Sequence, residues 1–305
     1  GGGAYDALAE LSLRIFAAAS ETGIGLCHLP VLYSFGGAER APLTGGQLRF
    51  ANDPDRFQTL IEAVVDGMAH LPADARCGVA PHSLRATDPS GLKLAQTLRP
   101  DAPFHIHIAE QPAEVDQIKA WLGARPVEWL MDNASVDQRW CLIHATHMTS
   151  AETRSLAQSG AVAGLCPMTE ANLGDGPFNG ASFLANGGAF GVGTDSNIRI
   201  SLNEVLRLLA CSQRLRDLSR NVLATPKKST GETLYLGAIA GGAQALGRAS
   251  GALAPGYLAD LVAIDGRSPQ LCGIPTDRIL DGVVFASGDR FVTDLWSAGR
   301  HCVKE

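Results

Sequence analysis

The sequence predicts an α/β fold and, within that class, a (β/α)8 barrel of the TIM type. Six short apolar runs alternate with helical patterns, which is typical of βα units built around a parallel sheet. Polar residues of metal-ligand and acid–base types follow several of these runs, at their C-terminal ends. A barrel builds its active site from the loops at that one face. A doubly wound sheet would need a glycine-rich phosphate loop, to which "GVGTDSN" is a poor match.

The apolar runs are expected to be strands three to eight of the barrel, and the two missing strands would precede residue 1. The runs cover residues 24–34, 76–83, 104–111, 140–147, 161–169 and 189–197. Helices are expected over 55–71, 90–99, 112–132, 150–160, 201–221 and 233–247. From Ser250 onward, short strands and turns follow one another. We therefore expect a barrel over 1–249 and the C-terminal part of a small β-rich domain over 250–305.

The amino-acid composition indicates which partners and which cellular compartment to expect. The formal net charge is −6, and no basic stripe is available to neutralise phosphates, so no nucleic-acid partner is expected. The seven cysteines are scattered without a CxxC pair, as expected for reduced thiols in a cytosolic protein. No run of about 18 apolar residues and no basic-then-apolar leader occurs, so we expect neither a membrane span nor a signal peptide.

The segment "FHIHIAE" (104–110) carries three polar residues with different expected roles. His105 and His107 are two apart on a strand, so both face the barrel interior. His107 lies nearer the C-terminal mouth and is the better candidate metal ligand, with a satisfied core histidine as the alternative. His105 is expected to be a deeper structural residue. Glu110 leaves the strand over the mouth, where it would be a general acid or base, or an acid in the first turn of the next helix.

Two further strand ends carry candidate residues. Asp195 ends the last apolar run, and a buried aspartate there is costly unless it meets a metal or another cation. The alternative, an N-cap for the next helix, is weaker because Ser201 is better placed for that role. His144 ends its own run in "LIHATH" and would ligate a metal or orient its water. His147 is expected to be a surface or structural residue.

His82 and Arg85 form a compact polar pair in "APHSLR". An arginine at the mouth of an acidic protein is suited to hold a carboxylate through two hydrogen bonds. A salt bridge within the loop is the alternative.

The combined pattern suggests a mononuclear divalent metal that activates water. A zinc site made of His107 and Asp195, with or without His144, would have too few ligands. The first strand of such a barrel should supply two more histidines, and they are not in this sequence.

These motifs resemble the amidohydrolase superfamily, in its mononuclear deaminase branch, and more narrowly the formimidoylglutamate deiminases. The similarity extends in order through "LPVLYS", "APHSLRA", "HIHIAEQ", "IHATHM", "LCPMTEANLGDG", "GVGTDSN" and "GALAPGYLADLVAID". The last motif marks only the superfamily, and "TEANLGDG" with "PHSLR" is the narrower signal. The resemblance implies zinc ligation by His107 and Asp195, proton transfer by Glu110, and a water held by His144 and Asp195. It also implies substrate contacts by His82 and Arg85, with a glutamate carboxylate as the partner of Arg85.

The implied reaction is hydrolysis of N-formimino-L-glutamate to N-formyl-L-glutamate and ammonia, a step of histidine degradation. One zinc per chain is expected, although His/Asp sites of this kind also accept Fe²⁺ or Mn²⁺. One alternative is another deaminase of this branch that acts on a purine, a pterin or a compound like S-adenosylhomocysteine. A second alternative is a catalytically inactive barrel that acts as a binding protein. A cytoplasmic homodimer is expected.

Overall fold

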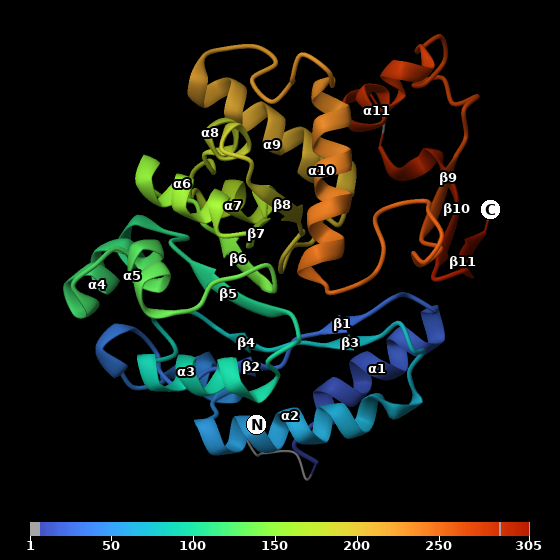
Figure 1. Ribbon diagram of the computed structural model, residues 1–305. Helices are drawn as coiled ribbons and strands as arrows, with labels where there is room; N and C mark the ends of the chain where they lie inside the picture. Colours follow the sequence, from blue (N-terminus) through green and yellow to red (C-terminus); the bar gives the residue numbers. More distant parts are fainter. Residues whose placement is uncertain (1–6, 287, 305) are drawn as a thin grey trace.

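The computed structural model describes residues 7–286 and 288–304 of the chain (Figure 1). Strands and helices alternate through most of it, and a small antiparallel sheet follows. The strands are β1 (Cys27–His28), β2 (Val31–Leu32), β3 (Arg76–Cys77), β4 (Ala80–Pro81), β5 (Phe104–Ile108), β6 (Trp140–His144), β7 (Val162–Leu165), β8 (Ala189–Val192), β9 (Leu261–Ile264), β10 (Val292–Ser297) and β11 (Arg300–Lys304). The α-helices are α1 (Glu10–Thr22), α2 (Pro54–Gly67), α3 (Pro89–Leu98), α4 (Pro112–Leu122), α5 (Pro126–Asn133), α6 (Ser150–Gln158), α7 (Pro167–Leu173), α8 (Gly180–Ala185), α9 (Leu202–Asp217), α10 (Thr230–Ala245) and α11 (Ile279–Asp281).

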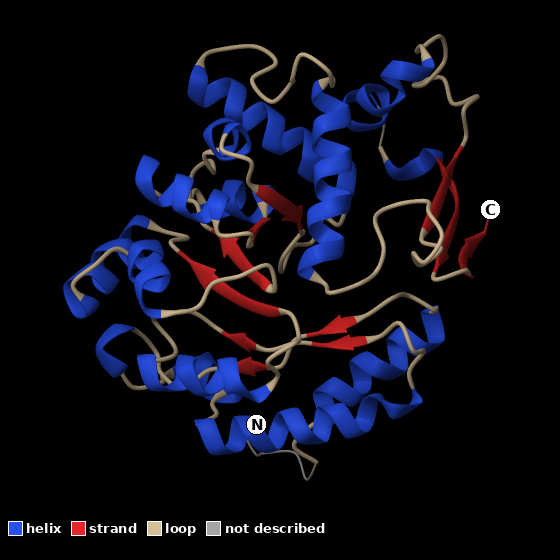
Figure 2. Cartoon of the chain, in the orientation of Figure 1, coloured by secondary structure: helices blue, strands red, loops and turns tan. Residues whose placement is uncertain are grey.

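Strands β1 to β8 form the parallel part of the structure. β5, β6, β7 and β8 make one four-stranded sheet in that order, while β1 pairs with β3 and β2 with β4. Single bridges at Val79–Phe104 and Ser83–His107 join the β3–β4 segment to β5. The six predicted strand positions therefore follow one another in chain order, with helices between them (Figure 2). This βα arrangement is that of a TIM-type barrel, and the predicted fold class is confirmed.

The first predicted strand is not continuous. Residues 24–34 contain two short strands, β1 and β2, with Pro30 between them. Proline has no N–H group, so Pro30 cannot donate a hydrogen bond to the neighbouring segment that contains β3 and β4, the partners of β1 and β2. Hydrogen bonds in the other direction continue past this point, because the Ala80 amide donates to the Pro30 carbonyl. The prediction of one strand over 24–34 was wrong in its continuity and right in its position.

The main hydrophobic core lies between the parallel sheet and its covering helices. Phe104, Ile106 and Ile108 of β5 are buried in it, together with apolar residues of β6 and of the helices that follow. Each such side chain stabilises the fold by roughly 1.5–3 kcal/mol when fully buried. The alternate residues of β5, His105 and His107, occupy the opposite face. This alternation confirms the predicted shared face of the two histidines.

The predicted run 76–83 is likewise divided, into β3 and β4, and two further predicted elements differ from the structure. The helical pattern over 112–132 is split into α4 and α5, because Gly123 adopts a left-handed conformation at φ 82° and ends α4. Pro126 then begins α5. The run 161–169 is a strand only as far as Leu165, and α7 begins at Pro167. Glu170 therefore lies on α7.

The C-terminal residues form an antiparallel sheet in the order β11–β10–β9. The sheet lies at the side of the molecule away from α4 (Figure 1). α10 packs along β8, and its last carbonyl, at Ala245, lies 2.7 Å from His105 Nε2. His105 thus has the structural role expected of it, while the division of the chain at residue 250 stays a prediction. No helix in the part of the chain that the structure describes is long and apolar enough to cross a membrane.

Candidate active site

Three histidine rings lie side by side across the C-terminal ends of three neighbouring strands. His82 follows β4, His107 is on β5 and His144 ends β6. The ring centroids of His82 and His107 are 4.7 Å apart, and those of His107 and His144 are 5.6 Å apart. Asp195 follows β8 and places its Oδ2 3.9 Å from His144 Nε2. The fold thus gathers residues that the sequence places at separate strand ends.

The backbone at these strand ends adopts left-handed conformations. Ala109, His144, Ala145 and Asp195 have φ angles of 50°, 67°, 48° and 55°. Residues other than glycine adopt this conformation at a cost, and such residues concentrate at functional sites where the surrounding structure holds them. Two hydrogen bonds hold the turn after β6: the Ala145 amide donates to the Ile108 carbonyl, and the His147 amide donates to the Ala109 carbonyl.

His107 has one ring nitrogen fixed by a hydrogen bond. Its Nδ1 lies 2.7 Å from the His82 carbonyl oxygen, which can only accept, so Nδ1 carries the proton. The Nε2 lone pair is then available to a metal, as is typical of metal-binding histidines. Burial lowers the pKa of His107, with opposition from the hydrogen bond to the His82 carbonyl. The lowered pKa favours the neutral ring, which is the form that binds a metal.

Three carboxylates surround the buried ring of His144. Nε2 lies 3.6 Å from Glu110 Oε1 and 3.9 Å from Asp195 Oδ2, and Nδ1 lies 3.3 Å from Glu170 Oε1. Burial disfavours the charged ring, but the hydrogen bond with Glu170 and the nearby carboxylates outweigh it, so the pKa of His144 is raised. A ring in this setting can hold a proton or a water molecule between two acidic groups.

Glu110 lies between His144 and Arg85, on the loop that follows β5. Burial raises the pKa of its carboxyl group, and the charges of His144 and Arg85 oppose the shift only in part. A raised carboxyl pKa suits a group that must both accept and return a proton near neutral pH. Glu110 precedes α4, and the acid in the first turn of that helix is Glu114. The alternative role considered for Glu110 is therefore excluded.

Arg85 faces two glutamates. Its Nη2 lies 3.5 Å from Glu110 Oε2 and 3.8 Å from Glu114 Oε2. Glu114 is buried and accepts hydrogen bonds from the amides of Ala109 and Glu110, which fixes the end of β5. The Nε of Arg85 is buried and has no hydrogen-bond partner among the described residues. A buried donor without a partner calls for one, and a ligand carboxylate would provide it.

His82 is held as a neutral ring beside Arg85. Burial, together with the charges of His107 and Arg85, lowers the pKa of His82 to about 3. Its Nδ1 lies 3.1 Å from the Ser83 hydroxyl, and the Tyr33 ring meets it edge-on at 4.6 Å. His82 can therefore offer a hydrogen bond to a ligand without adding a charge. Tyr33 was not singled out in the sequence, although it lies in the "LPVLYS" motif.

One group of side chains near the mouth has metal-ligand geometry. One potential ligand atom from each of His144, Cys166 and Asp195 lies within 4.8 Å of the others. Imidazole nitrogen and carboxylate oxygen are donors that zinc takes in proteins, whereas a cysteine binds it as the thiolate, so His144 and Asp195 are the members of this group that fit such an ion. His107 lies outside this group, although its free Nε2 lies on the same face. Asp195 is exposed and not buried as expected, because most of the loop 193–200 is itself exposed.

Three residues of this region were not predicted as site residues. Cys166 was hidden inside an apolar run, and burial together with Glu170 raises the pKa of its thiol. Glu170 is buried and accepts a hydrogen bond from the Cys166 amide. Asp175 is buried, its Oδ1 accepts from Gln111, and its Oδ2 has no partner in the described chain. The motif "TEANLGDG" contains both acids and was the signal that could have identified them.

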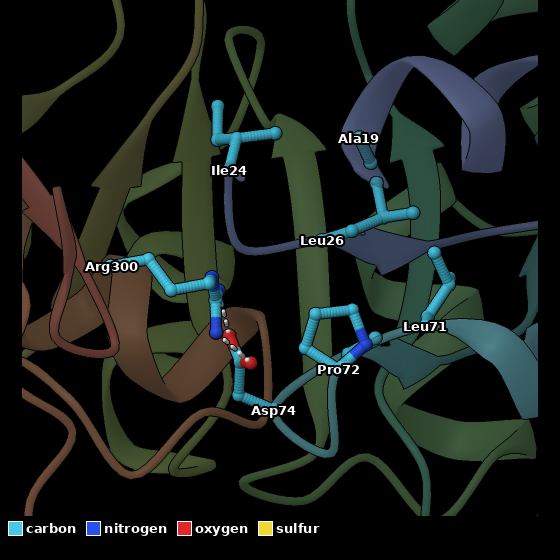
Figure 3. Close-up of a pocket in the computed structure, with 8 residues that line it drawn as sticks. Ala19, Ile24, Leu26, Leu71, Pro72, Asp74 and Arg300 are labelled. Carbon is cyan, nitrogen blue, oxygen red and sulfur yellow. Dashed lines mark hydrogen bonds and ion pairs between the residues drawn. The ribbon is translucent and has the colours of Figure 1, made fainter. Parts of the chain in front are cut away.

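A second polar cluster lies at the opposite, N-terminal ends of the strands. Arg300 of β11 places Nη1 2.7 Å and Nη2 2.9 Å from the two oxygens of Asp74, which precedes β3 (Figure 3). Arg248, buried after the end of α10, donates to the carboxylate and the carbonyl of the same aspartate. The shallow pocket beside this cluster is lined mainly by apolar residues: Ala19, Ile24, Leu26, Leu71, Pro72 and Ala75. None of the predicted site residues lies there.

Both the sequence and the fold are similar to those of known proteins. The sequence model of the Amidohydrolase family matches residues 6–302. The chain is 48% identical to formimidoylglutamate deiminase of Pseudomonas aeruginosa over 309 residues, which covers 100% of this chain and 67% of that protein. A crystal structure of an amidohydrolase from Brucella melitensis is 48% identical, with a TM-score of 0.94, and the match covers 99% of this chain and 67% of that one. An adenosine deaminase of Xanthomonas campestris, solved with bound zinc, has a TM-score of 0.81 at 22% identity and shares the fold over 96% of this chain and 64% of that one.

Proposed function

The chain belongs to the amidohydrolase family, and we propose that it carries most of the active site of a formimidoylglutamate deiminase. The reaction is hydrolysis of the C=N bond of N-formimino-L-glutamate, which gives N-formyl-L-glutamate and ammonia. The likeness of the whole chain to the Pseudomonas deiminase supports this substrate. The chain spans about two thirds of that relative's length. The proposed activity is therefore that of a protein in which this chain is joined to the remaining metal ligands.

The proposed metal ligands are His107 and Asp195, completed by a first-strand His-x-His pair that this sequence does not contain. The hydrogen bond from His107 Nδ1 to the His82 carbonyl leaves the lone pair of the neutral ring on Nε2. When bound, the metal would lower the pKa of a water molecule so that hydroxide forms near neutral pH. Zinc is proposed because the related adenosine deaminase was solved with it, and Fe²⁺ or Mn²⁺ would suit similar ligands.

Glu110, His144 and Asp195 are proposed to carry the protons of the reaction. Glu110 takes a proton from the attacking water and delivers it to the imine nitrogen as the C=N double bond becomes a single bond. A second proton, released by the new hydroxyl group to Asp195 as the carbonyl forms, then reaches the same nitrogen, which leaves as ammonia. A C–O bond forms and the C–N bond to the departing nitrogen breaks, so atoms balance with one water consumed. His144 and Asp195 hold the water in place, which is consistent with the 3.6 Å and 3.9 Å separations around His144 Nε2.

His82 and Arg85 are proposed to recognise the substrate. The uncharged ring of His82 offers a hydrogen bond, and Arg85 has the buried Nε donor that lacks a partner in the described chain. A glutamate-derived substrate carries two carboxylates, and a guanidinium binds a carboxylate through two parallel hydrogen bonds. Arg85 would then exchange part of its contact with Glu110 for the substrate.

We further propose a cytoplasmic homodimer. All seven cysteines are free thiols in the structure, which suits a reducing compartment. The homodimer is proposed from the family resemblance alone.

Side-by-side assays of ammonia release would test the proposed substrate. The full-length, zinc-loaded protein is expected to release ammonia from N-formimino-L-glutamate, and to leave S-adenosylhomocysteine and adenosine unchanged. Faster release from either nucleoside would contradict the substrate and support another deaminase of this branch. A zinc content near one per chain, measured by atomic absorption, would exclude the inactive binding protein.

A further inference from the structure

Glu170 occupies a position that the proton path described above does not use. It lies in the first turn of α7, is 4% exposed, and its Oε1 accepts a hydrogen bond from the Cys166 amide at 2.9 Å. This contact alone is an ordinary helix-capping interaction, in which an acid in the first turn satisfies the amide before the helix. The same oxygen also lies 3.3 Å from His144 Nδ1, and capping does not require that second contact.

The second contact decides which nitrogen of His144 carries a proton. An ionised carboxylate can only accept hydrogen bonds, so the Nδ1 that faces Glu170 must be the donor. In the neutral ring, Nε2 then carries the lone pair, and it is the nitrogen that faces Glu110 and Asp195. With the opposite tautomer, two lone pairs would face each other across 3.3 Å in a buried site.

We propose that Glu170 is a positioning residue, which holds the His144 ring with Nδ1 protonated and Nε2 presented to the reacting atoms. The inference rests on the proposed function for its effect on turnover, while the tautomer of His144 is independent of the substrate. The arrangement is a carboxylate–histidine pair that orients the second ring nitrogen, and removing such a partner usually costs activity roughly 10–100-fold.

Glu152 provides a matched control within the same fold. It is 5% exposed, lies in the first turn of α6, and accepts a hydrogen bond from the Thr149 amide at 2.8 Å. It therefore caps a helix as Glu170 does, and its charged partner is Arg125. Substitution of Glu152 reports the effect of losing a buried capping carboxylate that has no role at the mouth.

The test combines nitrogen NMR of the histidine rings with steady-state kinetics on the full-length, zinc-loaded protein. In the unsubstituted protein, long-range ¹H–¹⁵N spectra recorded above the pKa of His144, where the ring is neutral, are expected to show its single proton on Nδ1. Glu170→Met, which keeps side-chain length and removes the acceptor, should lose that preference, with kcat lowered roughly 10–100-fold and KM little changed. Glu170→Gln keeps a carbonyl that the Cys166 amide can orient, so it should retain the tautomer and lose less activity. Glu152→Met should leave the His144 signals and the kcat of the folded protein unchanged.

A proton found on Nε2 alone in the unsubstituted protein would overturn the proposal. So would a Glu170→Met protein with an unaltered tautomer and a kcat matching Glu152→Met. If Glu170→Met does not fold, the unsubstituted and Glu170→Gln spectra decide the question. Absence of any deiminase activity would refute the proposed function, and the ring spectra would still decide the role of Glu170.

Discussion

A polar cluster lies at each end of the parallel strands, and the two clusters differ in how their carboxylates are paired. At the N-terminal ends, Asp74 receives hydrogen bonds from both Arg248 and Arg300. At the C-terminal ends, Glu110, Glu170 and Asp195 surround His144, with one arginine near Glu110 at 3.5 Å. The first cluster neutralises its carboxylate within the protein, and the second leaves acceptors available to a ligand or a metal.

The pKa directions follow this difference in pairing. Hydrogen bonds from Arg300, opposed by burial and assisted by Arg248, hold the pKa of Asp74 well below its usual range. Burial instead raises the pKa of Glu110. A buried carboxylate that is paired with cations stays ionised and contributes to the stability of the fold. A buried carboxylate with little such pairing has a raised pKa and can exchange a proton near neutral pH. Barrels commonly divide their two faces in this way between stability and chemistry.

The largest expected effect of this contrast is on turnover, through Glu110→Gln. The amide keeps the shape of the side chain but cannot accept the proton of the water, so kcat should fall roughly 10²–10⁴-fold. Bound zinc, measured on the same preparation, should remain at the level of the unsubstituted protein. Near-normal turnover would contradict the role given to Glu110, and loss of zinc would move it into the metal-binding set.

At the other end of the strands, Asp74→Asn should act on stability and not on turnover. The change removes the Asp74 charge from the buried Arg248 guanidinium, which keeps only the longer contact with Asp260 at 3.3 Å, and breaking a buried pair costs up to about 3–5 kcal/mol. Urea denaturation should show a lower free energy of unfolding, while kcat of the folded protein stays unchanged. Asp217→Asn is the control, because Asp217 pairs with the neighbouring Arg216 at the surface, where such pairs contribute little. Equal losses in the two variants would remove the distinction between the clusters.

The sequence predicted the positions of the strands because hydrophobic periodicity and βα alternation are local signals. It also placed His107, His144 and Asp195 at one mouth, because a polar residue near the C-terminal end of an apolar run can be recognised in the sequence itself. The sequence did not predict that strand pairing is interrupted at Pro30. A proline interrupts pairing only where a neighbouring strand would accept a hydrogen bond from its backbone nitrogen, and that depends on the fold. The exposure of Asp195 likewise depends on the path of a loop and on no local pattern.

The undetected site residues share a physical reason. Glu170 and Glu114 each accept hydrogen bonds from backbone amides. Each also faces a side chain from another part of the chain, His144 for Glu170 and Arg85 for Glu114. Sequence spacing can suggest the contact with the backbone amide. The contact with His144 or with Arg85 can be recognised only when the positions of β6 and of the loop that carries Arg85 are known. Asp175 is similar, because its partner Gln111 is 64 residues away. Residues that orient others are therefore harder to predict than the residues they orient.

A smaller effect is expected from Arg85→Lys, which tests substrate binding at the mouth. Lysine keeps the positive charge but lacks the Nε donor and the planar fork that binds a carboxylate. We expect KM for N-formimino-L-glutamate to rise about 10-fold, equivalent to about 1.4 kcal/mol, with a smaller change in kcat. Arg125→Lys is the matched control, because the Arg85 and Arg125 side chains are equally exposed, at 27%, and each pairs with a buried glutamate. A similar rise in KM for both variants would count against a direct contact of Arg85 with the substrate.

The smallest effect expected concerns acid stability, and it belongs to Asp74. Its pKa is lowered in the folded protein, so the unfolded chain binds a proton first as the pH falls. The stabilisation is therefore complete above the unfolded pKa, near ~3.9, and is lost progressively below it. Between pH 5 and pH 3 this group should remove about 1 kcal/mol from the free energy of unfolding. Urea midpoints measured across that range should fall less steeply for Asp74→Asn than for the unsubstituted protein. Parallel curves would show that Asp74 titrates alike in both states, and that its two arginines do not hold its charge as the geometry indicates.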